Sequence, residues 1–334
     1  MQEHNDIQDE CGTNVFEQAI IEITDYCNFK CIHCYNDASH YQRSFDDIKK
    51  NIDIFEKLGV KSVILTGGEV LTYYEFEKVY RYLCQKNFEV TIFTNGSKIF
   101  DYKDLWIELP PSKFSISLYG INEAMYKDFT KTCDMFKRVK AGMDWIFDMK
   151  IPFEIKVIVT KKNIAKVMNG EYTKFANHYN TAIRYGMELF ETELHSSVIN
   201  DLRLDVNEMV SFMNLSINDK RRKRYLECED YDPIYQECKA GRSSLAVNSR
   251  GEYCICLRDV EYGYISENID EIRQFLINRK NELNVINSNR GCASCKANDI
   301  CNGICSLEPS MPGSVVCNFH NRMMKVVAEE NLNV

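Results

Sequence analysis

The sequence predicts an α/β protein: a partial (β/α)6 barrel followed by a C-terminal, loop-rich domain that contains a β-hairpin. Two observations predict the barrel. Short apolar, β-branched runs alternate with amphipathic helical stretches six times over residues 16–205. Polar or glycine-rich motifs directly follow several of these runs, where the loops of such a barrel carry function. A third observation predicts the second domain, because eight of the 15 cysteines lie beyond residue 237.

The expected domain boundaries follow from changes in composition along the chain. Polar, mostly acidic residues open it, and a charged, helical bridge without strand patterns separates the two cysteine-bearing parts. The expected segments are a tail (1–15), the barrel (16–205), the bridge (206–236), the cysteine-rich domain (237–320) and a C-terminal helix (321–334).

Local residue patterns mark where the strands and the helix of the first βαβ unit begin and end. Residues 16–24 read as a buried strand, and a cysteine-rich loop follows it. Ser44 and Asp47 predict a capping box at the start of a helix that Gly59 ends. Residues 61–66 form the second expected strand.

The alternation continues through four more strands. The expected elements are helix 74–86, strand 89–94, strand 113–118, a helical stretch to about 148, strand 153–160, helix 163–179 and strand 182–190. Residues 244–248 and 252–256 predict a hairpin, with loop-rich chain after it until a closing helix from about Asn318. Parallel strands joined by helices place their C-terminal ends on one edge, so the motifs at those ends are expected to meet.

Composition excludes several classes of function. The net charge of −8 argues against a nucleic-acid-binding surface. No apolar run is long enough to span a bilayer, and no secretory signal opens the chain, so we expect a cytoplasmic protein. In that compartment thiols stay reduced, and the cysteines indicate metal ligands or redox groups rather than disulfides.

The loop after the first strand carries the strongest local signal. Cys27, Cys31 and Cys34 are spaced C-x3-C-x2-C. Thiolates are the usual ligands of iron–sulfur clusters, and three of them leave one iron of a cubane open for another ligand. A zinc site is the alternative, with His33 close by as a fourth donor.

This loop resembles that of the radical S-adenosylmethionine (radical SAM) superfamily. The resemblance implies that Cys27, Cys31 and Cys34 hold a [4Fe–4S] cluster whose fourth iron is chelated by the methionine moiety of SAM. It implies that reductive cleavage of SAM generates a 5′-deoxyadenosyl radical, with the cofactor carrying the radical chemistry.

Further motifs at strand ends resemble the family's SAM-binding positions. Gly67-Gly68-Glu69 resembles the GGE motif that binds the SAM amino group, although Val70 replaces the usual proline. Asn95 and Ser117 are candidate contacts to the methionine carboxylate and the ribose, or simply a turn former and a strand cap. Tyr35, beside the last thiol, is also placed among the cofactor contacts.

The C-terminal cysteines resemble the seven-cysteine pattern of the SPASM extension, which holds two auxiliary [4Fe–4S] clusters in related proteins. The resemblance implies two ligand sets: Cys238, Cys256 and Cys305 for the first, and Cys292, Cys295, Cys301 and Cys317 for the second. The fourth ligand of the first cluster stays open between Cys228, Cys254 and an unligated iron. Two zinc knuckles are the alternative.

The resemblance implies a peptide-modifying enzyme that abstracts a hydrogen atom from a ribosomally made precursor. A thioether, a carbon–carbon cross-link or an epimerised residue would follow. Anaerobic sulfatase maturation, which generates formylglycine, is the alternative enzyme, and a non-catalytic electron-transfer scaffold is the alternative class.

The expected partners are a precursor peptide and a reductant such as flavodoxin or ferredoxin. Only about fifteen residues precede the first strand, so no winged leader-binding domain is expected within the sequence. Recognition would then use a separate leader-binding protein or the enzyme's own surface.

Overall fold

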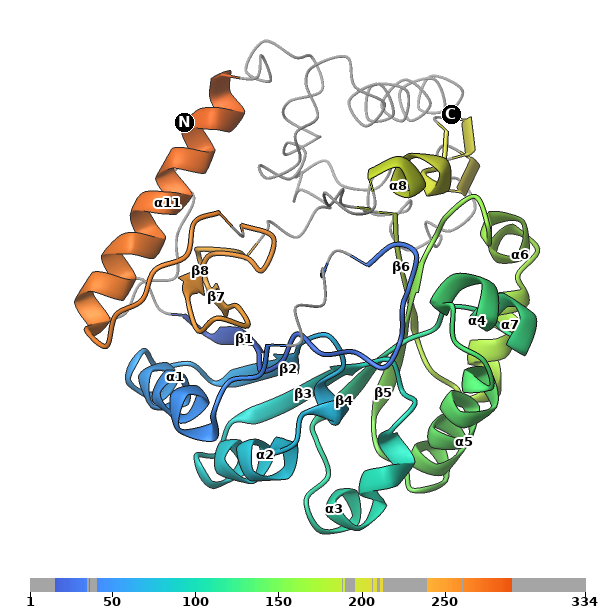
Figure 1. Ribbon diagram of the computed structural model, residues 1–334, viewed down its shortest axis with the longest axis horizontal. Coiled ribbons are helices and arrows are strands. Elements are labelled where there is room, and N and C mark those ends of the chain that lie inside the picture. Colours follow the sequence, from blue (N-terminus) through green and yellow to red (C-terminus); the bar gives the residue numbers. More distant parts are fainter. Residues whose placement is uncertain are drawn as a thin grey trace, which may run out of the picture.

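Figure 1 shows a computed structural model of the chain. The structure describes residues 16–34, 36, 41–187, 189, 196–205, 207–208, 211–212, 239–259 and 261–289. The N-terminal tail, Tyr35, nearly all of the expected bridge, the closing helix and six of the seven expected auxiliary-cluster ligands lie outside these residues. Cys256 is the auxiliary ligand that lies within them.

One open sheet of eight strands organises the described chain, in the order β6-β5-β4-β3-β2-β1-β7-β8. Every neighbouring pair is parallel except β7 and β8. The strands are β1 (Gln18–Glu22), β2 (Ser62–Thr66), β3 (Glu89–Thr94), β4 (Lys113–Ser117), β5 (Phe153–Ile158), β6 (Ile183–Gly186), β7 (Ser244–Val247) and β8 (Tyr253–Cys254). The sheet is curved and not closed, which confirms the expected partial barrel (Figure 1).

Helices cover the outer side of this sheet (Figure 1). They are α1 (Phe45–Lys57), α2 (Phe76–Gln85), α3 (Lys103–Glu108), α4 (Glu123–Thr130), α5 (Met135–Asp148), α6 (Ile164–Met168), α7 (Glu171–His178) and α11 (Ile269–Asn289). A further helix, α8 (Ser196–Leu202), lies apart from this layer and packs against Ile32 of the cysteine loop and Ile158 of β5. Two short 3-10 helices follow strand ends: η1 (Val70–Thr72) and η2 (Ile99–Tyr102). None of the described helices is long and apolar enough to cross a membrane.

The core lies between the sheet and these helices. Side chains alternate between the two faces of a strand, and one face of the central strands is fully buried and apolar. Its members include Ile21, Leu65, Ile92, Ile116 and Ile155, all with no exposed surface. The opposite, inner face therefore carries the alternate positions, many of which are polar.

The start of α1 was predicted closely. Ser44 is the N-cap, and its Oγ accepts a hydrogen bond from the Asp47 N–H at 3.2 Å. In a capping box, the Asp47 carboxylate would accept a hydrogen bond from the backbone N–H of Ser44. Here that carboxylate accepts instead from the Ser44 hydroxyl at 2.6 Å.

Two expected helices are broken. The stretch after β4 is split into α4 and α5 by Lys131 and Asp134, which have positive φ angles of 55° and 59°. The stretch after β5 is split into α6 and α7 at Gly170, whose φ is +73°. Helical periodicity continues across such breaks, so the pattern alone does not locate them.

The C-terminal part differs more from expectation. The hairpin β7–β8 extends the barrel sheet, with β7 parallel to β1 in the register Ile20↔Ala246. The chain beyond it was expected to be loop-rich up to the closing helix, and this was wrong, because α11 is a helix of 21 residues. Its buried side chains Ile272, Leu276 and Leu283 have the spacing of an apolar helix face, which the focus on cysteines missed.

Candidate active site

The cysteine loop leaves the C-terminal end of β1 and lies directly on the glycine motif after β2. The Gly68 N–H donates to the Thr24 carbonyl at 2.8 Å, and the Glu69 N–H donates to the Tyr26 carbonyl at 2.8 Å. A Cβ atom on Gly68 would lie 2.5 Å from the carbonyl oxygens of both Asp25 and Tyr26. The absence of a side chain at Gly68 therefore admits the backbone that carries the thiols.

Glu69 is buried at the centre of this contact. Its Oε1 accepts from the Leu71 N–H at 3.1 Å and the Thr94 hydroxyl at 2.6 Å, and its Oε2 accepts from the Asn95 N–H at 2.6 Å. Burial raises the pKa of this carboxyl, while the three donors act in the opposite direction. A carboxylate has about four acceptor positions, so one on Oε2 stays open to a further donor such as an ammonium group.

Asn95 connects Glu69 to the cysteine loop. Its side-chain amide donates to the Oδ1 atom of Asn28 at 2.9 Å and lies 4.0 Å from the Cys27 sulfur. Asn28 in turn donates to the Ser97 hydroxyl at 2.9 Å. Asn95, the expected SAM contact, therefore positions the cysteine loop in this structure. Asn28 and Ser97 belong to the same hydrogen-bonded chain, and the sequence analysis did not identify them.

The far side of the loop is held by the end of α4. The backbone N–H groups of Lys30 and Ile32 donate to the carbonyls of Thr130 and Phe129, both at 3.0 Å. These carbonyls lie in the last turn of a helix, where no intrahelical donor is present. Two neighbouring strand ends and one helix end thus fix the loop, although they are distant in sequence.

The His33 side chain packs against aromatic rings. Its ring lies 4.8 Å from the Phe129 ring and 5.5 Å from the Tyr119 ring, between centroids. Burial lowers the pKa of His33 to about 4, so the ring is neutral at pH 7. Its aromatic surroundings agree with a packing role rather than the fourth donor of a zinc site.

The three thiols fit an iron–sulfur cluster by donor chemistry. Cys31 is buried, and Cys27 and Cys34 are partly buried. Burial, and then the charge of Glu69, raise the pKa of Cys27 to about 12, while the Phe29 N–H donates to its sulfur at 3.4 Å. Iron would offset this cost because it binds the thiolate. Among the described residues no three Cys, His, Asp or Glu side chains lie as close together as a single metal ion requires.

Tyr119 is a site residue that sequence reasoning missed. Its ring stacks on Phe129 at 5.6 Å and packs against Phe29 and His33 of the cysteine loop at 6.2 and 5.5 Å, between centroids. It connects the end of β4, which carries the expected SAM contact Ser117, to the cysteine loop. The available signal was position, because Tyr119 lies two residues beyond Ser117 on the same barrel edge.

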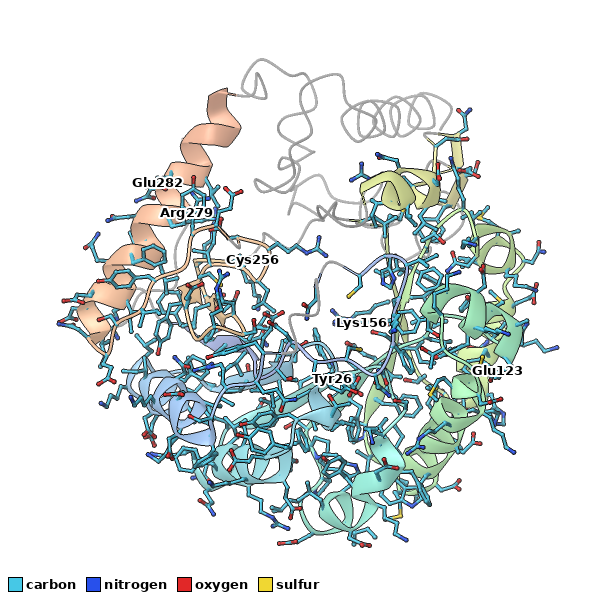
Figure 2. All side chains as sticks on the ribbon, in the orientation of Figure 1. Tyr26, Glu123, Lys156, Cys256, Arg279 and Glu282 are labelled. Carbon is cyan, nitrogen blue, oxygen red and sulfur yellow. The ribbon has the colours of Figure 1, made fainter. Side chains whose placement is uncertain are left out.

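Two C-terminal cysteines lie within the described chain. Cys256 follows β8 on the inner side of the sheet (Figure 2) and is partly buried. Cys254 is 1% exposed, and its thiol donates to the Ala246 carbonyl at 3.6 Å, a placement typical of a packing cysteine. Cys228, the other candidate for the fourth ligand, lies outside the described residues.

The fold and site define a class: a partial barrel with a three-thiol loop at the C-terminal edge of its parallel sheet. The comparison with protein families agrees with this class. Residues 21–165 match the model described as "Radical SAM superfamily". This part of the chain, less than half of its length, is thus similar to a radical SAM domain.

Curated relatives match parts of the chain. An AdoMet-dependent heme synthase of Methanosarcina barkeri is 26% identical over 44% of this chain and 43% of its own length. A probable GTP 3′,8-cyclase of Saccharolobus solfataricus is 31% identical over 44% of this chain and 49% of its own. The subtilosin biosynthesis protein AlbA of Bacillus subtilis is 26% identical over 47% of this chain and 37% of its own. The matches span less than half of each relative.

Solved structures share the fold over more of the chain. SuiB of Streptococcus suis, bound to S-adenosylmethionine, has a TM-score of 0.66 at 16% identity and covers 88% of this chain and 74% of its own. The protein named anSMEcpe, with bound AdoMet, has a TM-score of 0.69 at 17% identity and covers 95% of this chain and 98% of its own. The fold shared with these structures therefore extends beyond residues 21–165, which match the family model.

Proposed function

We propose that the protein is a radical SAM enzyme that modifies a peptide. Cys27, Cys31 and Cys34 would hold a [4Fe–4S] cluster, and SAM would bind beside Glu69, Asn95 and Ser117. With SAM, that cluster would supply a 5′-deoxyadenosyl radical for hydrogen abstraction. The observation that carries the proposal is the three-thiol loop seated on Gly67-Gly68-Glu69 at the C-terminal edge of the sheet.

The surroundings of the loop support the role proposed for each residue. The open acceptor position on Glu69 suits the amino group of SAM. Asn95 and Asn28 keep the loop in register with β3, and Tyr119 connects the end of β4 to the cysteine loop. The chain would thereby orient SAM against the open iron and exclude water from that edge.

A peptide substrate is supported by proteins of the same fold. SuiB has been solved with its precursor peptide SuiA, and AlbA is named for the biosynthesis of the bacteriocin subtilosin. The matches to GTP cyclases and a heme synthase cover between 44% and 66% of this chain. The fold shared with SuiB covers 88% of it, which favours the peptide-modifying subgroup.

Two auxiliary [4Fe–4S] clusters belong to the same proposal. Cys256 would bind the first together with Cys238 and Cys305, and the second would use Cys292, Cys295, Cys301 and Cys317. The place of Cys256 on the inner side of the sheet (Figure 2) supports an auxiliary cluster on the same side as the radical site.

Sulfatase maturation is the second candidate. The supporting observation is the fold that anSMEcpe shares over 95% of this chain. That protein has also been solved with a peptide named Cp18Cys. Incubation with that peptide distinguishes the candidates, because formylglycine formation changes the mass of its cysteine residue in a way that cross-linking or epimerisation does not.

The central test is SAM cleavage by anaerobically reconstituted protein with dithionite as reductant. We expect 5′-deoxyadenosine to form, and about twelve irons to bind per chain if all three clusters are present. Cys31→Ala should abolish cleavage, whereas Cys84→Ala, which changes a half-buried thiol of α2, should leave it unchanged. Protein that holds iron but never cleaves SAM would contradict the proposal and favour an electron-transfer scaffold.

A further inference from the structure

The inner face of β4, β5 and β6 carries an excess of positive charge. Its charged side chains are Lys113 on β4, Glu154 and Lys156 on β5, and Arg184 on β6. The register brings them together, because Ser115 lies opposite Glu154 and Lys156 lies opposite both Ser117 and Arg184. Three cations therefore face one carboxylate.

That carboxylate already accepts from three donors. Glu154 accepts from Lys113 Nζ at 3.1 Å, from the Ser115 hydroxyl at 2.9 Å and from Arg184 Nε at 3.0 Å. It is 7% exposed, and its neighbours lower its pKa against the opposing effect of burial. Glu154 thus pairs with Lys113 and Arg184, and among the described residues Lys156 has no ion pair.

Lys156 lies in an unusual place for a lysine. Its ammonium nitrogen is 3.4 Å from the centroid of the Phe93 ring, on the inner face of β3. Within the described part of the chain no carboxylate lies within 4.0 Å of this nitrogen. Figure 2 shows the side chain reaching inward from β5, away from the layer of α4 and α5.

The environment is costly for a charged group. Burial lowers the pKa of Lys156 from 10.5 to about 8, the charges of Lys113 and Arg184 add to this effect, and Glu154 opposes it. The ring face of Phe93 stabilises a cation but does not neutralise it. An anion from outside the chain would do so.

We infer that Lys156 is a binding residue for a carboxylate of a ligand held on the inner face of the sheet. The position favours this role because Ser117, opposite Lys156 in the register, lies two residues before Tyr119, whose ring packs against Phe29 and His33 of the cysteine loop. A ligand on Lys156 would therefore lie beside the proposed radical site. The inference rests on the proposed function, and it adds the chemistry of the recognised group.

Two ligands of such an enzyme can provide the carboxylate, namely SAM itself and an acidic residue of the peptide substrate. Two arms of one binding experiment separate them, with reconstituted wild-type protein, Lys156→Met and Lys156→Arg. The first arm measures Kd for SAM and for decarboxylated SAM. The second measures Kd for a blocked pentapeptide with a central Glu and for its Gln counterpart.

The expected result is a carboxylate preference in one arm of about tenfold, the size of one charge-assisted hydrogen bond. Lys156→Met should abolish that preference, and Lys156→Arg should keep most of it. The preference of the wild-type protein should also decline between pH 7 and pH 9, as the ammonium loses its proton. Lys140→Met, on the outer helix α5, is the matched control and should change neither arm.

Equal affinities within both pairs, or a preference that survives in Lys156→Met, would overturn the inference. Thermal unfolding of each variant shows whether a loss reflects misfolding, and Lys156→Arg supplies a second variant if Lys156→Met is unstable. Wild-type protein that cleaves SAM without a carboxylate preference rejects this inference alone. Wild-type protein that neither binds SAM nor holds iron rejects the proposed function with it.

Discussion

Gly68 shows how one missing side chain determines the site. The loop that carries Cys27 crosses it so closely that the backbone carbonyls of Asp25 and Tyr26 occupy the space of a Cβ atom. The same contact is closed by two backbone hydrogen bonds, from Gly68 and Glu69. Packing at this point decides where the thiols stand relative to Glu69.

Gly68→Ala should therefore separate the cysteine loop from the sheet. We expect a loss of about 3 kcal/mol in the free energy of unfolding, typical of overpacking in a tight contact, together with a loss of iron. Gly170→Ala is the matched control, because its Cβ would meet no atom within 4 Å and only its φ of +73° opposes the change. It should cost about 1 kcal/mol and keep the iron. Equal losses in urea unfolding and iron content would contradict the role of Gly68.

Lys156 predicts a pH dependence of stability. Its pKa is about 8 in the folded chain against an ordinary value of 10.5, so between these values the unfolded chain binds more protons. The free energy of unfolding of the wild-type protein, measured relative to that of Lys156→Met, therefore rises with pH across this window. Thermal unfolding at pH 7 and pH 10 should show the Tm difference moving in favour of the wild-type protein. Lys140→Met controls for the loss of one lysine, and a difference independent of pH would contradict a desolvated Lys156.

Sequence motifs located the loop and its glycine support, because Cys27, Cys31, Cys34 and Glu69 belong to short local patterns. They did not locate Asn28, Tyr119 or Lys156. These residues act through neighbours that are distant in the sequence or on another strand, as in the Asn28–Asn95 hydrogen bond, where the separation is 67 residues. A single sequence carries no signal for such pairs until the strand order is known.

At the scale of elements, one buried ion pair joins the loop after β8 to α11. Arg279 donates from Nε and Nη2 to the two oxygens of Asp259 at 2.9 and 2.8 Å, and the two side chains are 8% and 2% exposed. The Asp259 N–H donates to the Cys256 carbonyl at 3.0 Å. The pair therefore links α11 to Cys256, the residue proposed above as an auxiliary-cluster ligand, and Figure 2 labels Arg279 and Cys256.

Arg279→Met should leave the Asp259 carboxylate buried and unpaired. We expect the free energy of unfolding to fall by about 3–5 kcal/mol, with loss of about four irons if Cys256 holds a cluster. Arg81→Met removes a similar two-bond pair with Glu108, which is exposed at 33% and 58%, and should cost under about 1 kcal/mol. Similar losses in both variants, by urea unfolding and iron analysis, would refute this account of Asp259.

The elements themselves were predictable to different degrees. The strands were found because β-branched runs such as that of β2 are bounded by glycine or polar residues. Breaks at Lys131 and Gly170 were not, since they depend on left-handed backbone positions that the hydrophobic pattern does not encode. The stretch that forms α11 has its apolar residues widely spaced among charges, and it was read as loop.

At the scale of the molecule, the β7–β8 hairpin is part of the same sheet as the strand before the cysteine loop. Because β7 pairs with β1, the sheet runs without a break from β6 to β8. The cysteine loop follows β1, which lies between β2 and β7, and Cys256 lies two residues after β8. The sequence placed the hairpin in a separate domain because nothing local reveals a parallel pairing between strands some 220 residues apart.

The most direct test of the whole account is single-turnover SAM cleavage by anaerobically reconstituted protein, followed by analysis for 5′-deoxyadenosine. The account predicts about one 5′-deoxyadenosine per chain under dithionite, none from Cys31→Ala, and a strongly reduced amount from Gly68→Ala at equal folded protein. Iron-loaded, folded wild-type protein that binds SAM and yields no 5′-deoxyadenosine would contradict the claim that this loop is a radical-generating site.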